Sequence, residues 1–155
     1  AVTISITLVA AYALWMGIMN IAKEARMVSG LARSLRPVTR RLFKGVPEGA
    51  QAHEYIALNL SANVFGLGNA ATPYGIKAME ELQRYNKRPR FATNAMCMLL
   101  IVNASSVQVL PTTVMALRAS AGSAEPAAIA LPALLATMVN TVFAVALAKL
   151  TERYM

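Results

Sequence analysis

Two long apolar runs, at residues 2–21 and 127–150, lie near the two ends of the chain. The first carries no charged residue, and the second carries only Lys149, near its end. About 20 helical residues, each rising about 1.5 Å, reach across the hydrocarbon core of a bilayer. The two runs therefore predict transmembrane helices.

Residues 22–43 combine apolar and basic positions with helical spacing. The basic residues lie on the face opposite to the apolar residues, which predicts a basic amphipathic helix in the membrane interface, kinked or restarted at Pro37. A target helix for an acidic partner is the less favoured alternative beside two membrane spans. The apolar positions recur every third or fourth residue: Ala25, Val28, Leu31, Leu35, Val38 and Leu42.

Residues 50–65 predict a helix too short to span a bilayer, with Asn59 and Asn63 on one face because they are four apart. Gly66 is expected as its C-cap, followed by an unwound stretch over residues 66–75. Thr72 is expected as the N-cap, and Pro73 as the first residue, of a helix that ends near residue 85. Both outer ends of this pair of helices are basic, so the simplest topology is a re-entrant hairpin that enters and leaves the membrane on the cytoplasmic side.

Residues 91–110 predict another apolar helix, which Pro111 interrupts. A half-helix over residues 112–121 follows and ends at Gly122, and Pro126 begins the last helix. Residues 91–121 either cross the membrane or fold back within it. Crossing would place the C-terminus on the side of the basic loops, which Lys149 and Arg153 slightly favour.

The two interrupted helices carry similar polar strings. Residues 69–72 read Asn-Ala-Ala-Thr ahead of Pro73, and residues 103–106 read Asn-Ala-Ser-Ser ahead of Pro111. Paired broken helices are typical of transporter binding sites. Unwound backbone persists in lipid only where other groups satisfy its hydrogen bonds.

Amide and hydroxyl side chains near both breaks predict a site for a small polar solute. The helix start at Thr72 would also suit an anion, with Lys77 or Arg118 as counter-charges, although these two are more expected to reach lipid headgroups. The alternative is that the same polar groups only hold helices together. The candidate ligand-binding residues are Asn59, Asn63, Asn69, Thr72, Asn103, Ser105, Ser106, Thr112 and Thr113.

Composition supports the membrane hypothesis and argues against nucleic acid. Hydrophobic residues make up 57% and charged residues 14% of the 155 residues, and the net charge is +8. The basic residues cluster between the apolar runs, as the positive-inside bias predicts, so we expect no nucleic-acid partner.

Catalytic chemistry has little support in the sequence. The chain contains no Asp, one His and one Cys, so paired intramembrane carboxylates, a Ser-His-Asp set and a cysteine metal cluster are absent. We expect no enzyme activity, no metal and no cofactor. His53 is expected at the surface or as a cap, and Cys97 as a small buried hydrophobe.

Several strings share a pattern with one known family. They are Leu60–Leu82, which contains Gly-Leu-Gly-Asn-Ala-Ala-Thr-Pro, together with Asn94–Cys97, Asn103–Ser106, Pro111–Thr113, Ala116–Ser123 and Leu14–Met19. Through these strings nearly the whole chain resembles the spore maturation protein A family. That family belongs to the nucleoside-recognition, or Gate, group, whose domain also occurs in concentrative nucleoside transporters and ferrous-iron transporters.

The resemblance implies a multi-pass protein of the bacterial cytoplasmic (inner) membrane. Its partners would be the lipid bilayer, a spore maturation protein B-like sister and further copies in a homo- or hetero-oligomer, and it would contribute to spore-core dehydration in spore formers. Family members have a further hydrophobic helix ahead of the position of Ala1, so we expect an upstream segment.

Taken together, we expect one all-α membrane domain over residues 1–155, with transmembrane helices, broken or re-entrant half-helices and a basic interfacial helix. We expect it to bind a small polar solute in a transport-type role. A structural or regulatory subunit that assembles with its sister without transporting a solute is the alternative.

Overall fold

The computed structural model describes residues 24–152 and six single positions ahead of them, at 6, 9, 10, 13, 17 and 21. The span predicted at residues 2–21 therefore lies outside the described residues, apart from these positions. The described part is helical and contains no strand, in agreement with the predicted all-α class. Its elements are α2 (Met27–Leu42), α3 (Gln51–Val64), α4 (Gly68–Arg84), α5 (Asn94–Ser105), α6 (Thr112–Ser120), the 3-10 helix η1 (Pro126–Ile129) and α7 (Ala130–Thr151).

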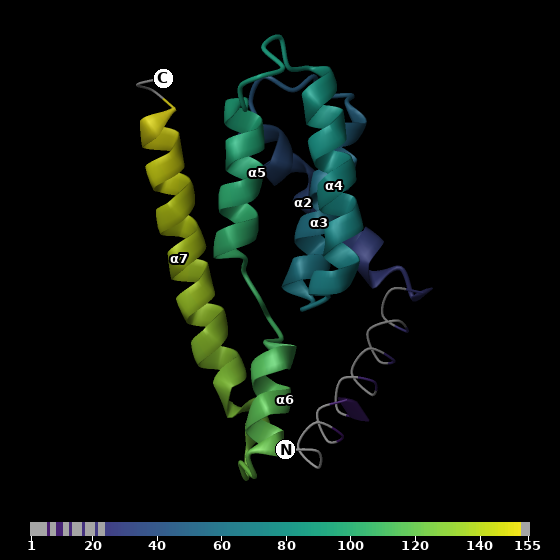
Figure 1. Ribbon diagram of the computed structural model, residues 1–155, viewed down its shortest axis with the longest axis vertical. Helices are drawn as coiled ribbons and strands as arrows, with labels where there is room; N and C mark the ends of the chain where they lie inside the picture. The colour runs from purple at the N-terminus through teal and green to yellow at the C-terminus, as the bar shows by residue number, and fades with distance from the viewer. Residues whose placement is uncertain are drawn as a thin grey trace.

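The helices form a hairpin beside a longer antiparallel pair. Helices α3 and α4 form the hairpin, and α2 packs against α3 (Figure 1). Helix α5 continues through an extended segment at residues 106–111 into α6, and α7 returns alongside them (Figure 1). Thr141 Oγ1 on α7 donates to the Ser105 carbonyl at 2.9 Å, and the Gln108 N–H donates to Thr137 Oγ1 at 3.4 Å. Residues 94–120 thus run in one direction along α7 and do not double back.

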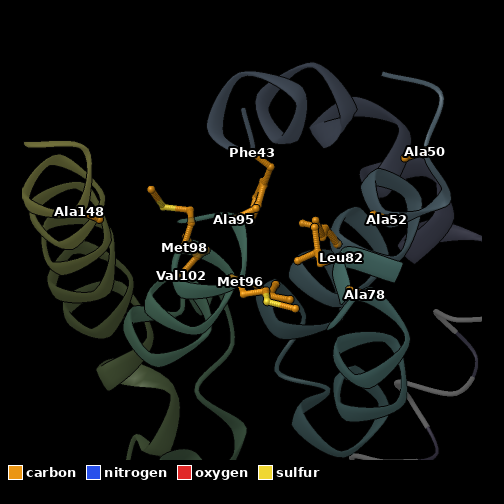
Figure 2. Close-up of a cluster of buried hydrophobic side chains, with 12 residues drawn as sticks. Phe43, Ala50, Ala52, Ala78, Leu82, Ala95, Met96, Met98, Val102 and Ala148 are labelled. Carbon is orange, nitrogen blue, oxygen red and sulfur yellow. The ribbon is translucent and has the colours of Figure 1, made fainter. Parts of the chain in front are cut away.

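The main apolar cluster lies where α2 ends and α5 begins. Figure 2 shows the side chains of Phe43, Leu82 and Met96 near one another, with Met98 on the side toward α7. Phe43 is 1% exposed and Leu82 is 2% exposed. Burying side chains of this size stabilises the fold by about 1.5–3 kcal/mol each. Alanines complete the cluster and allow close helix approach: Ala50, Ala52, Ala78, Ala95 and Ala148.

The predicted C-terminal span is confirmed as one apolar helical stretch that begins at Pro126. Pro126–Thr151 has 26 residues and a mean hydropathy of 2.0 over its most apolar window, and it is long and apolar enough to cross a membrane. In the described part of the chain it is the one helix with this property, since α5 has only 12 residues. Many of its large apolar side chains are exposed: Leu131, Leu135, Met138, Val139, Val142, Phe143, Leu147 and Leu150.

The amphipathic helix is present but shorter than predicted. It begins at Met27, because the backbone of Arg26 is left-handed (φ 59°) and residues 25–26 form a turn. Pro37 lies inside α2 without ending it. Helix α2 does have a buried and an exposed basic face, since Ala32 and Thr39 are buried whereas Arg33 and Arg36 are exposed. The buried positions are not those of the predicted apolar row, however, because Leu31 and Leu35 are only half-buried and Val38 is 47% exposed.

The prediction of an unwound stretch over residues 66–75 is wrong. The interruption covers only residues 65–67, and Thr72 and Pro73 lie inside α4, so Thr72 does not cap a helix start. The physical reason is a tight reversal at Gly66, whose φ is +72°. The Gly66 N–H donates to the Asn63 carbonyl at 2.9 Å and the Leu67 N–H to the Ala62 carbonyl at 2.8 Å, which is the Schellman pattern. The Ala71 N–H already bonds to the Leu67 carbonyl, so α4 begins at once.

Three further expectations are corrected. His53 is fully buried, because α3 packs against both α2 and α4. Cys97 is exposed, whereas its neighbours Met96 and Met98 are buried in the core. Helix α5 ends at Ser105, six residues ahead of Pro111, because the chain leaves the helix to pack against α3 and α7.

Candidate functional site

The two helix interruptions are packed against each other. The Val109 N–H, in the segment after α5, donates to the Val64 carbonyl at the end of α3, with an N–O distance of 3.0 Å. A Cβ on Gly66 would lie only 2.5 Å from the Leu110 carbonyl oxygen. Leu110 packs with Phe65 against a small buried cluster that includes Leu67. Gly66 is therefore needed both for its positive φ and for this close approach.

A cleft of about 470 Å³ opens between α3, α4 and α5. Its polar lining comes from four of the predicted site residues, Asn59 and Asn63 on α3, Thr72 on α4 and Asn103 on α5. The remaining lining is glycine or apolar: Ala71, Gly75, Ile76, Met79, Leu99 and Leu100.

Asn63 and Asn103 form a direct amide pair across the cleft. Asn63 Nδ2 donates to Asn103 Oδ1 at 2.7 Å, although the two residues are 40 apart in the sequence. Each primary amide has donor and acceptor capacity beyond a single bond. The pair therefore leaves the Asn103 amide nitrogen as a donor and the Asn63 amide oxygen as an acceptor, and both side chains are partly exposed.

Asn59 holds α4 against α3. Its Nδ2 donates to the Ala71 carbonyl at 2.9 Å, and the residue is only 3% exposed. Gly75 makes room for this amide, since a Cβ there would lie 2.9 Å from Asn59 Nδ2. Within the described residues Asn59 Oδ1 has no hydrogen-bond partner. Asn59 therefore shapes the wall of the cleft more than it offers an accessible group.

Four of the other predicted site residues, Ser105, Ser106, Thr112 and Thr113, are not part of the described lining of the cleft. The Ser105 hydroxyl donates to the Ile101 carbonyl of its own helix at 2.9 Å. Ser106 Oγ is buried and has no partner among the described residues. The Thr112 methyl group lies next to Gly66, and Thr113 is exposed on α6. The side chain of Asn69 lies outside what the structure describes.

The apolar half of the cleft was not predicted. Residues 72, 75, 76 and 79 follow one another at helical spacing on α4, as do residues 99, 100 and 103 on α5. This spacing was the available signal, because positions three or four apart share a helix face with the predicted polar residues.

Charged groups do not contribute to the described lining of the cleft. Lys77 Nζ lies 5.6 Å from the ring centroid of Tyr55. Arg118 Nη2 lies 3.2 Å from Ser123 Oγ and 3.4 Å from the Glu125 carbonyl oxygen. Neither cation is part of the lining, where it could neutralise an anion bound in the cleft. The arrangement therefore suits an uncharged solute better than an anion. The described residues also contain no group of three or more His, Cys, Asp or Glu side chains that would hold a metal.

Comparison with known proteins assigns the family. Neither a family model nor a solved structure matches the chain. The chain is 41% identical over 145 residues to Spore maturation protein A of Bacillus subtilis (strain 168), an alignment that covers 94% of this chain and 74% of that protein. This identity over almost the entire chain confirms the resemblance seen in the motifs around Gly66 and Asn103. The chain belongs to the spore maturation protein A family.

Proposed function

We propose that this protein is a multi-pass protein of the bacterial inner membrane, which binds a small uncharged polar solute between α3, α4 and α5 and acts in spore maturation through a transport-type role. The observation that carries the proposal is the cleft with the Asn63–Asn103 pair, next to two mutually packed helix interruptions. The similarity to Spore maturation protein A of Bacillus subtilis supports the link to spore maturation.

The proposed membrane placement follows from shape and charge. Pro126–Thr151 would span the bilayer, and α5, residues 106–111 and α6 would cross it in the opposite direction. The α3–α4 hairpin would enter and leave from one side, with its turn at Gly66 beside residues 106–111. Exposed basic residues gather at the opposite end of the hairpin, which would be cytoplasmic: Arg40, Arg41, Lys44, Lys87, Arg88 and Arg90.

The lining narrows the class of solute. The Asn63–Asn103 pair presents one donor beside one acceptor, and the side chains of Ile76, Met79 and Leu99 add an apolar surface. A solute with a flat, weakly polar face and an edge that both donates and accepts hydrogen bonds would complement this surface. A nucleoside has these properties, and the family resemblance makes it the first compound to test.

The experiment is a thermal-shift titration of the purified chain in detergent with uridine. We expect saturating uridine to stabilise the wild type, by about 2.7 kcal/mol at 100 times the dissociation constant. Asn63→Ala and Asn103→Ala should lose this shift. Asn140→Ala, which removes an exposed asparagine of α7 outside the cleft, should keep it.

Equal uridine shifts in all four proteins would contradict the assignment of the site. A shift with inorganic phosphate but not with uridine would contradict the uncharged class of solute while leaving the cleft in place.

A structural or regulatory subunit is the second candidate, and the Asn63–Asn103 hydrogen bond favours it. This bond joins α3 to α5, and such amide contacts hold helices together in membranes. On this hypothesis the protein assembles with a spore maturation protein B-like sister or with itself and carries no solute. Asn63→Ala would then lower the melting temperature by the same amount with and without uridine.

A further inference from the structure

A second hollow lies between α2 and α3 and shares no lining residue with the solute cleft. Its volume is about 240 Å³. Ser29, Ala32, Arg33 and Arg36 line it from α2, and Glu54, Ala57 and Leu58 line it from α3. We call this hollow the α2–α3 groove.

The cationic wall of the groove consists of two arginines one helical turn apart. Arg33 and Arg36 are both exposed, and in the described part of the chain neither guanidinium takes part in an ion pair. The Ser29 side chain lies four residues before Arg33 and therefore on the same face. Guanidinium groups bind phosphate through paired N–H donors, and a serine hydroxyl can add one more.

The opposite wall carries a single carboxylate, Glu54 on α3, which is exposed. Glu54 makes no ion pair with Arg33 or Arg36 among the described residues. Two cations facing one carboxylate complement a ligand that carries both a phosphate and an ammonium group. The Glu54 carboxylate would repel a ligand that carries only negative charge.

The rest of the groove and of α2 is suited to a lipid. Ala32, Ala57 and Leu58 give the groove an apolar component. Another flank of α2 leaves apolar side chains uncovered, with Met27 51% exposed and Val38 47% exposed. A helix with exposed apolar and basic flanks lies in the plane of the membrane interface, which brings its arginines to the depth of the headgroups.

We propose that the α2–α3 groove binds the headgroup of phosphatidylethanolamine, with the phosphate at Arg33 and Arg36 and the ammonium group at Glu54. This site is separate from the solute cleft and does not depend on the proposed transport role. It gives α2 a specific lipid contact in addition to its general attraction to the membrane surface.

The test is native mass spectrometry of the full chain in detergent, titrated with dilauroyl phosphatidylethanolamine and, separately, with dilauroyl phosphatidylglycerol. We expect Arg33→Gln and Arg36→Gln each to weaken binding of phosphatidylethanolamine about five-fold, since a basic residue near lipid headgroups contributes on that order. Arg41→Gln is the matched control, because Arg41 is an exposed arginine of the same helix outside the groove, and it should bind as the wild type does.

Glu54→Gln tests the ammonium contact. This variant should lose the preference for phosphatidylethanolamine over phosphatidylglycerol while still binding both lipids. It keeps both arginines, so it tests the site even if an arginine variant folds poorly.

Three results would overturn the proposal. Weakening of binding by Arg41→Gln as large as that by Arg36→Gln would reduce the effect to general charge. If Glu54→Gln kept the preference for phosphatidylethanolamine over phosphatidylglycerol, the proposed ammonium contact would be wrong. Displacement of the lipid by an equal concentration of inorganic phosphate would show that the groove binds a free anion.

Discussion

Gly66 shows how much of the fold can depend on one residue. Its φ of +72° lies in the region that side-chain-bearing residues rarely adopt, and the Leu110 carbonyl occupies the space that a Cβ would need. We expect Gly66→Ala to lower the free energy of unfolding by about 2 kcal/mol or more, since the left-handed backbone alone costs an alanine about 1–2 kcal/mol. Denaturation of the purified chain in mixed micelles would measure the change.

Gly30 supplies the control for this substitution. It lies inside α2, where a new Cβ would meet nothing within 4 Å. Gly30→Ala should therefore stabilise the protein, by up to about 1 kcal/mol. Equal effects of the two substitutions would contradict the importance of the contact between the two helix interruptions.

Gly75 and Asn59 are expected to be energetically coupled. A methyl group at Gly75 would lie 2.9 Å from Asn59 Nδ2 and would displace the amide from the Ala71 carbonyl. We expect Gly75→Ala to be less favourable in the wild type than in an Asn59→Ala background by about 1 kcal/mol, the usual net contribution of one hydrogen bond. In the Asn59→Ala background the substitution should stabilise the protein as Gly30→Ala does, because an alanine inside a helix is favoured over glycine. A double-mutant cycle measures this coupling. Additive effects would show that Gly75 does not serve to admit the Asn59 amide.

At the scale of single elements, α7 makes the clearest prediction. Val139 is 71% exposed near the middle of this apolar helix. If α7 spans the bilayer with this side chain toward lipid, Val139→Lys should raise the insertion free energy by about 2.5–3.5 kcal/mol. Membrane fractionation or a glycosylation-based insertion assay would detect the change, with Val139→Ala as the control. Normal insertion of the lysine variant would argue against a lipid-facing position.

The element boundaries that were predictable from the sequence are those set by local chemistry. Gly66 and Gly122 both adopt positive φ after helices, and Pro126 begins a helical stretch. The start of α4 was not predictable from Thr72 and Pro73, because the tight reversal at Gly66 allows the helix to begin at Gly68. The end of α5 at Ser105 depends on contacts with Val64 and Thr141, which are distant in the sequence.

For the whole molecule, the proposed topology can be tested by labelling introduced cysteines in intact cells. In a Cys97→Ser background, Lys87→Cys marks the α4–α5 loop and Ser123→Cys marks the turn between α6 and η1, at the opposite end of the molecule (Figure 1). We expect a membrane-impermeant maleimide to label the cysteine at position 123 directly. The cysteine at position 87 should react only after the inner membrane is permeabilised. Labelling of both positions under the same condition would contradict a crossing by α5 and α6.

Only the polar part of the candidate site could be predicted from the sequence. The asparagines at positions 59, 63 and 103 were identified because polar residues in apolar helices point to function. Their mutual contact was not predictable, since the Asn63–Asn103 bond requires α3 and α5 to be neighbours. The apolar wall was missed for the same reason, because Ile76 and Leu99 resemble ordinary core or lipid-facing residues until the helices are placed together.

Lys149 connects the long apolar helix to the amphipathic one. Its Nζ lies 2.8 Å from the Leu42 carbonyl at the end of α2 and 2.8 Å from Glu152 Oε2. A helical stretch of 26 residues measures about 39 Å, longer than a hydrocarbon core of about 30 Å, so if this helix spans a bilayer it must tilt or protrude. Bilayer thickness would then set the height of Lys149 and, through this bond, the depth at which α2 rests, which would make the position of α2 sensitive to stretching or thinning of the membrane.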